Sequence, residues 1–321
     1  MKSRLHSSLN GSPASGRGSS SSEGADGEHK PSRARAAETE KSFLAKHGVT
    51  IALVAVMLIG VGIFLYPIAS NYINSLSQSY AVANYQDAVE STNQDELDQM
   101  LAKAQAWNAE LAYKGGSLNS ISGVELDEYN ALLNIEGINV MGYIEIDKIN
   151  VRLPIYHSTG DDALAIGVGH LEGSSLPVGG ESTHCVLMAH RGLPTSMLFT
   201  DLDRLEVGDT FAITVLAETR YYEVDQVLIV EPDDLSALHI EEGQDLCTLV
   251  TCTPYGVNTQ RLLVRGHRTS APNSDYGSSD ARIVDGLVVA TVITAVLILA
   301  LVVGLVIWTR TKKKRVLGPR R

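Results

Sequence analysis

The segment "TLVTCTPYGVNTQR" holds the residues of this chain that are best suited to covalent chemistry. Its cysteine, Cys252, ends an apolar run that reads as a strand, and Pro254 and Gly256 turn the chain directly afterwards. A thiol at a strand end beside a turn is partly exposed, as a nucleophile requires. Arg261 follows nine residues after Cys252 and opens the next predicted strand. If the two strands pair, the permanently charged donors of Arg261 lie where they can stabilise the charge that the thiol creates.

A histidine, His190, ends another apolar run, "VLMAH", and precedes a loop that begins "RGLP". Histidine is the side chain that most often serves as a general acid or base, so His190 is a candidate partner for the thiol. A structural role is equally open to it, and its spacing does not distinguish it from five other histidines of the same segment: His157, His170, His184, His239 and His267.

The other two cysteines, Cys185 and Cys247, each lie inside an apolar run, which is the usual setting of a buried and inert thiol. Instead of being a nucleophile, Cys252 could likewise be a buried, inert thiol. Instead of stabilising the charge of the thiol, Arg261 could form a surface ion pair. Three cysteines do not make a disulfide scaffold, although one disulfide is possible and would leave a free thiol. Without a Cys-x-x-Cys motif we expect no structural zinc site, and the sequence predicts no other metal or cofactor.

Strands that would carry these residues begin after Gly137, where the sequence becomes rich in Ile, Val and Tyr. Short strands separated by Gly, Asp and Pro predict a mainly β domain, closed as a barrel or packed as a sandwich. Strands do not alternate with helices here, which argues against a Rossmann-type sheet. The stretches with this pattern are 141–157, 184–190, 209–232, 245–252 and 260–269.

A helical N-terminal extension, residues 68–140, precedes the strands. "STNQDE" offers an N-cap, and glycines in 113–123 end the helix that follows. We expect 124–137 to be a loop, with or without a short helix. The helix is predicted because apolar residues recur at steps of three and four and so share one face: Leu97, Met100, Leu101, Ala104, Trp107 and Leu111.

Two uncharged apolar stretches have the length of membrane helices, which need about 20 residues. The first occupies 47–67 and ends at Pro67, and the second occupies 286–308. A cleaved signal peptide is the alternative for the first stretch. That stretch is long for a signal peptide, however, and begins far from the N-terminus. The sequence therefore predicts two transmembrane helices that flank the β domain.

The positively charged residues that flank the two predicted membrane helices indicate how these helices are oriented in the membrane. Lys41 and Lys46 precede the first, and a basic tail, 309–321, follows the second. The positive-inside rule then puts both termini in the cytoplasm and the domain between the helices outside the cell. Residues 1–46 are rich in Ser, Gly and charge and are predicted to be disordered. Residues 273–285 are predicted to be a linker.

The segment outside the membrane is acidic. Residues 68–282 contain 11 Lys and Arg against 31 Asp and Glu. Such a charge balance argues against nucleic acid as a partner. It is compatible with a soluble domain held near a surface.

Together, "TLVTCTPYGVNTQRLLVRGHR", "LMAHRGLPTSMLFTDLDRLEVGD" and "MGYIEIDKINVRLPIYH" resemble the sortases, and among them class C, the pilin-polymerising group. The similarity runs from Met141 to Arg268. Thr-Leu-x-Thr-Cys with an arginine nine residues on, joined to His-Arg-Gly-Leu-Pro and Leu-Phe-Thr-Asp-Leu-Asp, is a specific combination. A second membrane helix and a basic tail are also usual in class C.

This resemblance implies that 141–272 form the sortase catalytic domain, a closed β-barrel of about eight strands with short helices. It matches Cys252 to the nucleophile, His190 to the general acid and base, and Arg261 to the arginine that stabilises the oxyanion or the substrate. The implied enzyme is a cysteine transpeptidase that cleaves an LPXTG-like sorting signal between Thr and Gly through a thioester. The implied acceptor of the acyl group is an amine, in class C a pilin lysine.

Two departures from the family pattern stand out. The family usually has histidine where this chain has Gln260, but the neighbouring Asn258, Thr259 and Arg261 are intact, so we expect little cost to the chemistry. Class C sortases usually carry a lid over the thiol with an Asp-Pro-aromatic motif, and residues 68–140 contain no such tripeptide. An inhibitory lid at 114–130 would therefore lack its usual anchor.

Other functions remain as alternatives. A cysteine protease would use the same thiol and histidine, and a housekeeping sortase would attach surface proteins to a cell-wall amine. A sortase substrate would need an LPXTG-like pentapeptide before Gly286, and none occurs there. A surface receptor without enzymatic activity is the remaining alternative.

Overall fold

The computed structural model describes residues 33–115, 118, 123–135, 138–271 and the separate residues 294–296, 298, 300, 302 and 304. Its contacts divide the chain into two units, Met1–Leu58 and Ile59–Arg321, and the second unit contains every strand. The predicted second span, 286–308, lies outside the described residues except for those separate positions. The predicted linker, 273–285, and the basic tail lie outside them as well.

Helix α1 (Arg33–Ser91) contains the predicted first span and continues through Pro67. Its part Ala52–Ser91 includes a stretch with a mean hydropathy of 2.4, which is long and apolar enough to cross a bilayer. The helix also includes residues 33–46, for which the composition predicts disorder. Ala and Glu are frequent there, and both are strong helix formers.

Helices α2 (Gln94–Tyr113) and α3 (Val124–Ala131) follow. The predicted N-cap of α2 is Asn93, whose Oδ1 accepts a hydrogen bond from the backbone N–H of Asp95 at 2.9 Å. Leu97 and Ala104 of the predicted apolar face are buried. The short helix foreseen after residue 123 is α3.

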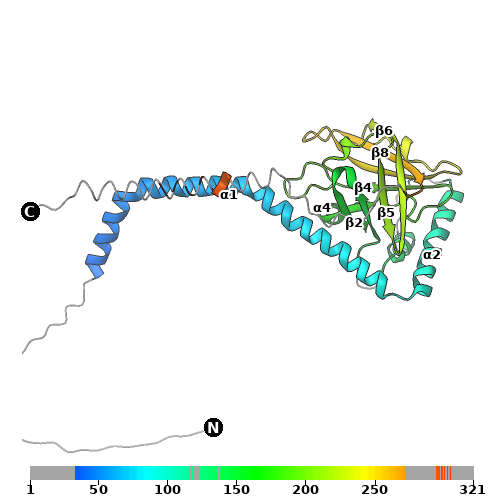
Figure 1. Ribbon diagram of the computed structural model, residues 1–321, viewed down its shortest axis with the longest axis horizontal. Coiled ribbons are helices and arrows are strands. Elements are labelled where there is room, and N and C mark those ends of the chain that lie inside the picture. Colours follow the sequence, from blue (N-terminus) through cyan, green and yellow to red (C-terminus); the bar gives the residue numbers. More distant parts are fainter. Residues whose placement is uncertain are drawn as a thin grey trace, which may run out of the picture. The chain divides into compact units, whose positions relative to one another are not determined.

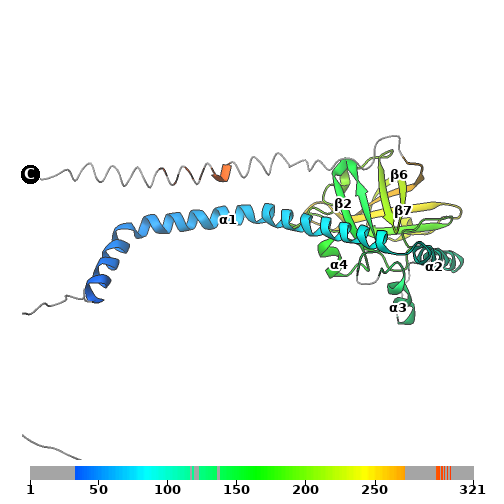
Figure 2. The same ribbon diagram turned by 60° about the horizontal axis from the view of Figure 1, so that its bottom comes forward.

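Eight strands form a closed barrel in the order β1-β2-β3-β4-β7-β8-β6-β5, as the class C resemblance implies (Figures 1 and 2). Most neighbours are antiparallel, but β2 with β3 and β4 with β7 are parallel pairs. Short helices α4 (Asp161–Ile166), η1 (Asp147–Ile149), η2 (Leu202–Arg204) and η3 (Ser236–Leu238) lie between strands. The strands are β1 (Gly142–Ile146), β2 (Val151–His157), β3 (Val168–His170), β4 (Thr183–Met188), β5 (Thr210–Val215), β6 (Glu218–Val230), β7 (Asp245–Thr253) and β8 (Gln260–Thr269).

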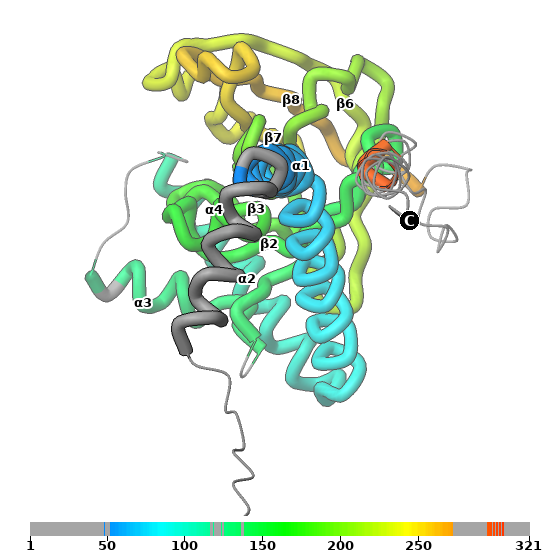
Figure 3. Tube along the Cα trace, turned by 90° about the vertical axis from the view of Figure 1, so that its left-hand side faces the viewer, coloured from blue at the N-terminus to red at the C-terminus, as the bar shows by residue number. Residues whose placement is uncertain are grey.

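The part of α1 that follows Pro67 packs against the barrel, beside which its cyan turns are seen in Figures 2 and 3. Tyr85 is fully buried, and its hydroxyl donates to the carbonyl of Met141 at 3.0 Å and accepts from the N–H of Leu216 at 2.6 Å. These bonds attach the helix to the start of β1 and the end of β5. The helix and the barrel therefore share one hydrophobic core.

Candidate active site

Cys252 and Arg261 lie directly opposite each other where β7 and β8 pair. The two strands pair antiparallel, as their predicted relation requires, and the turn between them holds the residues on either side of Pro254–Gly256 together. Both side chains are half-buried. The guanidinium of Arg261 donates to the carbonyl of Gln260 at 3.2 Å, and within the described part of the chain its other N–H groups remain available to another group.

His190 lies beside Cys252 on the side away from Arg261, because β4 and β8 flank β7. Strand β4 runs parallel to β7 with Met188 opposite Val250, so two residues farther on His190 comes opposite Cys252. The backbone N–H of Ala189 continues this pairing by donating to the carbonyl of Val250 at 3.2 Å. Neighbouring strands lie about 4.8 Å apart, and residues two apart point to one face. The structure thus brings the three predicted site residues close together, with Cys252 and Arg261 on adjacent strands and His190 two residues past the end of β4.

Three of the remaining histidines are held in structural contacts. Nitrogen atoms of His170 and His184 are bonded to Tyr129 and Thr248 at 2.9 Å and 2.7 Å. Nε2 of His157 donates to the carbonyl of Leu132 at 2.8 Å. Burial lowers the pKa of His157 to about 4, against the smaller raising effect of that hydrogen bond. These contacts fix the three rings within the fold, whereas His190 is half-buried at the end of β4.

Arg191 is part of this site, although the sequence did not single it out. Its side chain is only 7% exposed and forms an ion pair with Asp203 of η2. Its Nη1 also lies 3.4 Å from Oγ1 of Thr253, the residue after Cys252. The guanidinium is 5.9 Å from the ring centre of Tyr255, and its Nε–H has no acceptor among the described residues. Its place directly after His190 was the signal available in the sequence.

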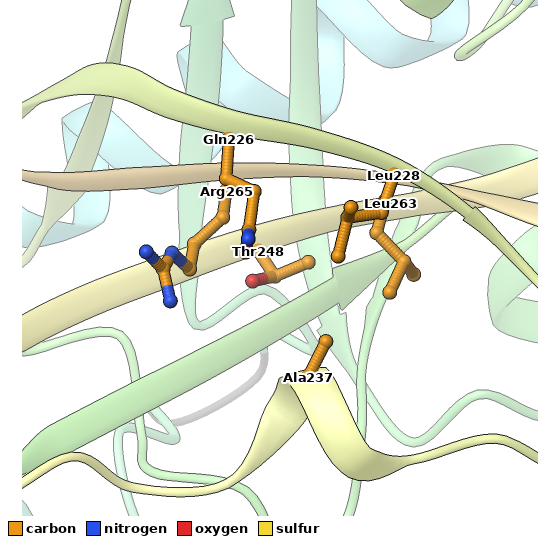
Figure 4. Close-up of a pocket in the computed structure, with 6 residues that line it drawn as sticks. All are labelled: Gln226, Leu228, Ala237, Thr248, Leu263 and Arg265. Atoms are coloured by element: carbon orange, nitrogen blue, oxygen red, sulfur yellow. The ribbon is translucent and has the colours of Figure 1, made fainter.

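An apolar groove lies along the outer face of β4, β7, β8 and β6 and includes Arg261, the residue opposite Cys252. Its floor is a cluster of buried residues, Val186, Val250 and Leu263, and Leu238 of η3 covers it. A cavity of about 80 Å³ lies in the groove. Figure 4 shows the residues of a neighbouring pocket that shares Leu263 with it, where Ala237 of η3 lies across from Thr248 of β7. The cavity is lined by Leu171, Met188, Val230, Pro232, Asp234, Leu235, Leu238, Val250, Arg261 and Leu263.

Leu118 also packs against the apolar cluster that floors the groove. It belongs to the stretch 114–130, in which an inhibitory lid was considered. The residues on either side of Leu118 lie outside the described part of the chain. In the same stretch, Tyr129 of α3 is buried against His170, so this end of the stretch belongs to the domain core.

Cys185 and Cys247 are buried, as predicted, and lie opposite each other where β4 and β7 pair. Both are free thiols in the barrel interior, on the face opposite to Cys252. Burial raises the pKa of Cys247, and its hydrogen-bonded neighbour Cys185 raises it further. Burial acts on Cys185 in the same sense, but hydrogen bonds with Cys247 and His170 outweigh it and lower that pKa.

Comparison with known proteins relates this arrangement to a family. The sortase domain family matches residues 144–269. Sortase C1 of Streptococcus agalactiae, a solved structure, is 48% identical over 60% of this chain and 100% of that one, with a TM-score of 0.59. The chain belongs to the sortase family. The sortase C of Streptococcus pneumoniae, whose structure was related to pilin substrate specificity, is 42% identical over 60% of this chain and 98% of that one, with a TM-score of 0.54.

A curated sortase, sortase D of Bacillus subtilis (strain 168), is 33% identical over 132 residues. The match covers 40% of this chain and spans 64% of that sortase. Sortases are cysteine transpeptidases, and a partly exposed thiol such as that of Cys252 is what a cysteine nucleophile requires. The first-named structural relatives are class C sortases, which agrees with the class that the sequence motifs resemble.

Proposed function

We propose that this chain is a membrane-anchored class C sortase that joins pilins through an LPXTG-like sorting signal. One observation carries the proposal: Cys252 lies opposite Arg261 on adjacent strands, the register of β4 and β7 brings His190 opposite Cys252 two residues past the end of β4, and Arg261 lines an apolar groove. Cys252 is the nucleophile, His190 the general acid and base, and Arg261 the donor that stabilises negative charge on the substrate.

In the first step the thiolate of Cys252 attacks the carbonyl carbon of the bond between Thr and Gly of the sorting signal. A tetrahedral intermediate forms, and its oxyanion accepts hydrogen bonds from Arg261. Removal of one such donor typically costs about 10²–10³ in rate. The C–N bond then breaks as His190 gives a proton to the leaving amine of the glycine. The products are a thioester on Cys252 and a released C-terminal fragment.

In the second step an amine attacks the thioester carbonyl. His190 takes a proton from that amine, the C–S bond breaks, and Cys252 leaves as the thiolate. The new bond is an amide, and with a lysine side chain as the acceptor it is an isopeptide bond between two pilins. Similarity to class C sortases supports the lysine acceptor, and a cell-wall amine is the alternative.

The groove is suited to bind the sorting signal before the reaction. An LPXTG-like peptide begins with apolar leucine and proline, and the cavity walls include Met188, Val230 and Val250. Arg261 lines the same cavity and lies opposite Cys252, so a peptide that fills the groove ends beside the thiol. Apolar contacts give affinity and the arginine gives orientation, as is usual for such sites.

The membrane arrangement supports a tethered reaction. One described helix is able to span a bilayer, and a second span over 286–308 is proposed from the sequence. Both termini would be cytoplasmic and the acidic catalytic domain extracellular. A substrate tethered to the same membrane meets the enzyme at a high effective concentration.

The test is a comparison of the full chain with its Cys252→Ala variant in cells that make the candidate pilin. The variant is expected to leave pilins monomeric, and high-mass pilin ladders from it would refute the nucleophile. Mass spectrometry of the product with and without an added amine separates the alternatives. A transpeptidase gives the amine adduct, whereas a protease gives the hydrolysed acid in both cases.

A further inference from the structure

Helix α1 holds the loop that follows His190 through three hydrogen bonds. Oδ1 of Asn71 accepts from the N–H of Met197 at 3.0 Å. Nδ2 of Asn74 donates to the carbonyl of Thr195 at 2.7 Å, and Nε2 of Gln78 donates to Oγ of Ser196 at 3.0 Å. The three helix residues are spaced by three and four positions, so they share the face that packs against the barrel.

This loop, residues 192–200, is a compact extension of the active site. The N–H of Phe199 donates to the carbonyl of His190 at 3.2 Å, and the N–H of Gly192 donates to Oγ1 of Thr200 at 3.1 Å. Its two ends are therefore closed beside His190. Its tip is Thr195–Met197, the part that α1 binds, and the Met197 side chain is 49% exposed. The loop contains no charged residue.

Exposed apolar side chains lie on the turns of α1 that directly precede these contacts. Ile63, Phe64 and Tyr66 are 70%, 68% and 59% exposed, and they belong to the helix that is able to cross a bilayer. Asn71 follows Tyr66 by five residues, a rise of roughly 7–8 Å at 1.5 Å per residue. The headgroup layer on each side of the hydrocarbon core is about 5–8 Å thick. The contact between Asn71 and Met197 thus falls at the depth of the headgroups.

We propose that the tip of this loop, Thr195–Met197, rests in the lipid headgroup layer, so that the bilayer is the partner of the active-site end of the barrel. An uncharged tip with one exposed methionine suits this layer, because the rest of the domain is acidic and would be repelled by anionic lipids. The site then lies close to the membrane and acts on peptide bonds near the membrane surface. The action on peptide bonds near the membrane rests on the proposed function, whereas the position of the loop rests only on its contacts with α1 and on the apolar surface of that helix.

The experiment measures the depth of one added tryptophan at a time in the full chain, after subtraction of the emission of the native Trp107. The chain is reconstituted in phosphatidylcholine vesicles, half of whose lipid carries bromine on the acyl chain near the headgroup. Every variant is built on Trp308→Phe and Cys252→Ala, so the reading does not depend on catalysis. Met197→Trp probes the loop, and Tyr66→Trp reports that the helix is inserted.

The matched control is Val207→Trp, an exposed position three residues before the start of β5. Position 207 lies at the end of the barrel opposite to Cys252. From the start of β5, Thr210 pairs with Glu223, Glu223 pairs with His267, and His267 pairs with Leu246. Leu246 is six residues before Cys252 on β7. We expect bromine to quench the emission added by Met197→Trp at least twofold more than that added by Val207→Trp. Equal quenching of the two variants, or no quenching of Met197→Trp, would overturn the proposal, as would an unquenched Tyr66→Trp.

Discussion

Arg191 connects the neighbours of His190 and Cys252: it directly follows His190 in the chain, and its Nη1 lies 3.4 Å from Oγ1 of Thr253, the residue after Cys252. Its second nitrogen pairs with Asp203 of η2. One buried side chain therefore links the end of β7 to the residue after His190, and we propose that Arg191 positions His190 and Cys252.

Arg191→Lys is expected to lower kcat about 10- to 100-fold with little change in KM, because lysine cannot reach two partners with a planar fork. Steady-state kinetics with a sorting peptide and an amine measure both constants. Arg204→Lys is the matched control, since Arg204 forms an exposed ion pair with Asp201 three residues away. An equal loss in both variants would show that the effect is not specific to Arg191.

Arg261→Lys is expected to reduce kcat by about 10²–10³, because the substituted ammonium lacks the planar fork that we propose to stabilise the oxyanion. Arg265→Lys provides the comparison from the same strand, where the arginine binds Asp225 and Glu241 instead. The measurement is the rate of thioester formation in a single turnover. A normal rate for Arg261→Lys would remove this arginine from the mechanism.

Gln260→His restores the residue that the sortase family usually has at this position. Nε2 of Gln260 donates to Oε1 of Glu231 at 2.9 Å, and this contact is exposed. An exposed pair of this kind contributes little, so we expect the transpeptidation rate to stay within about twofold and the stability within about 0.5 kcal/mol. A tenfold gain in rate would mean that Gln260 limits the enzyme.

Thiol labelling separates the three cysteines by burial. Cys252 is half-exposed, whereas Cys185 and Cys247 are 2% and 0% exposed. A maleimide is therefore expected to modify the native protein once, at Cys252, and the denatured protein three times. Intact mass and peptide mapping give the number and the position. Rapid native labelling of Cys185 or Cys247 would contradict the parallel pairing of β4 with β7.

The stability of the domain is expected to fall as the pH drops from about 6.5 towards 4. Burial lowers the pKa of His157 to about 4 from its ordinary value of 6.5. The unfolded chain therefore binds a proton in this window before the folded chain does, and stability that is complete above pH 6.5 is lost below it. The loss from His157 amounts to about 3 kcal/mol. His157→Gln is expected to flatten the slope of unfolding free energy against pH, and an unchanged slope would assign it to other groups.

The sequence predicted the elements that have a clear period or a clear sequence of turn residues. The strands that carry Cys252 and Arg261 are apolar and separated by a Pro/Gly turn, and the structure pairs them as that pattern requires. Strand β3, only three residues long and buried throughout, has no alternation to detect. A strand of this length forms because its neighbours β2 and β4 provide its hydrogen bonds.

The candidate site was only partly accessible from the sequence. His190 could not be separated from other histidines by spacing, because its position opposite Cys252 depends on the parallel register of β4 and β7. Arg191 was missed for a related reason, since Asp203 and Thr253 reach it only in the folded chain. The assignment of His190 came instead from the resemblance of its motif to the sortases, because local patterns did not provide it.

The parallel register of β4 and β7 also affects when the thiol becomes reactive. Their ends meet across a separation of 62 residues, as in the hydrogen bond from Thr251 to Ala189. Contacts between such distant parts of a chain form slowly, because a long loop must close first. Until this pairing forms, Cys252 therefore has neither His190 nor Arg191 beside it. If the proposed roles hold, the thiol gains its acid–base partner only when the barrel closes, so a partly folded chain is inactive.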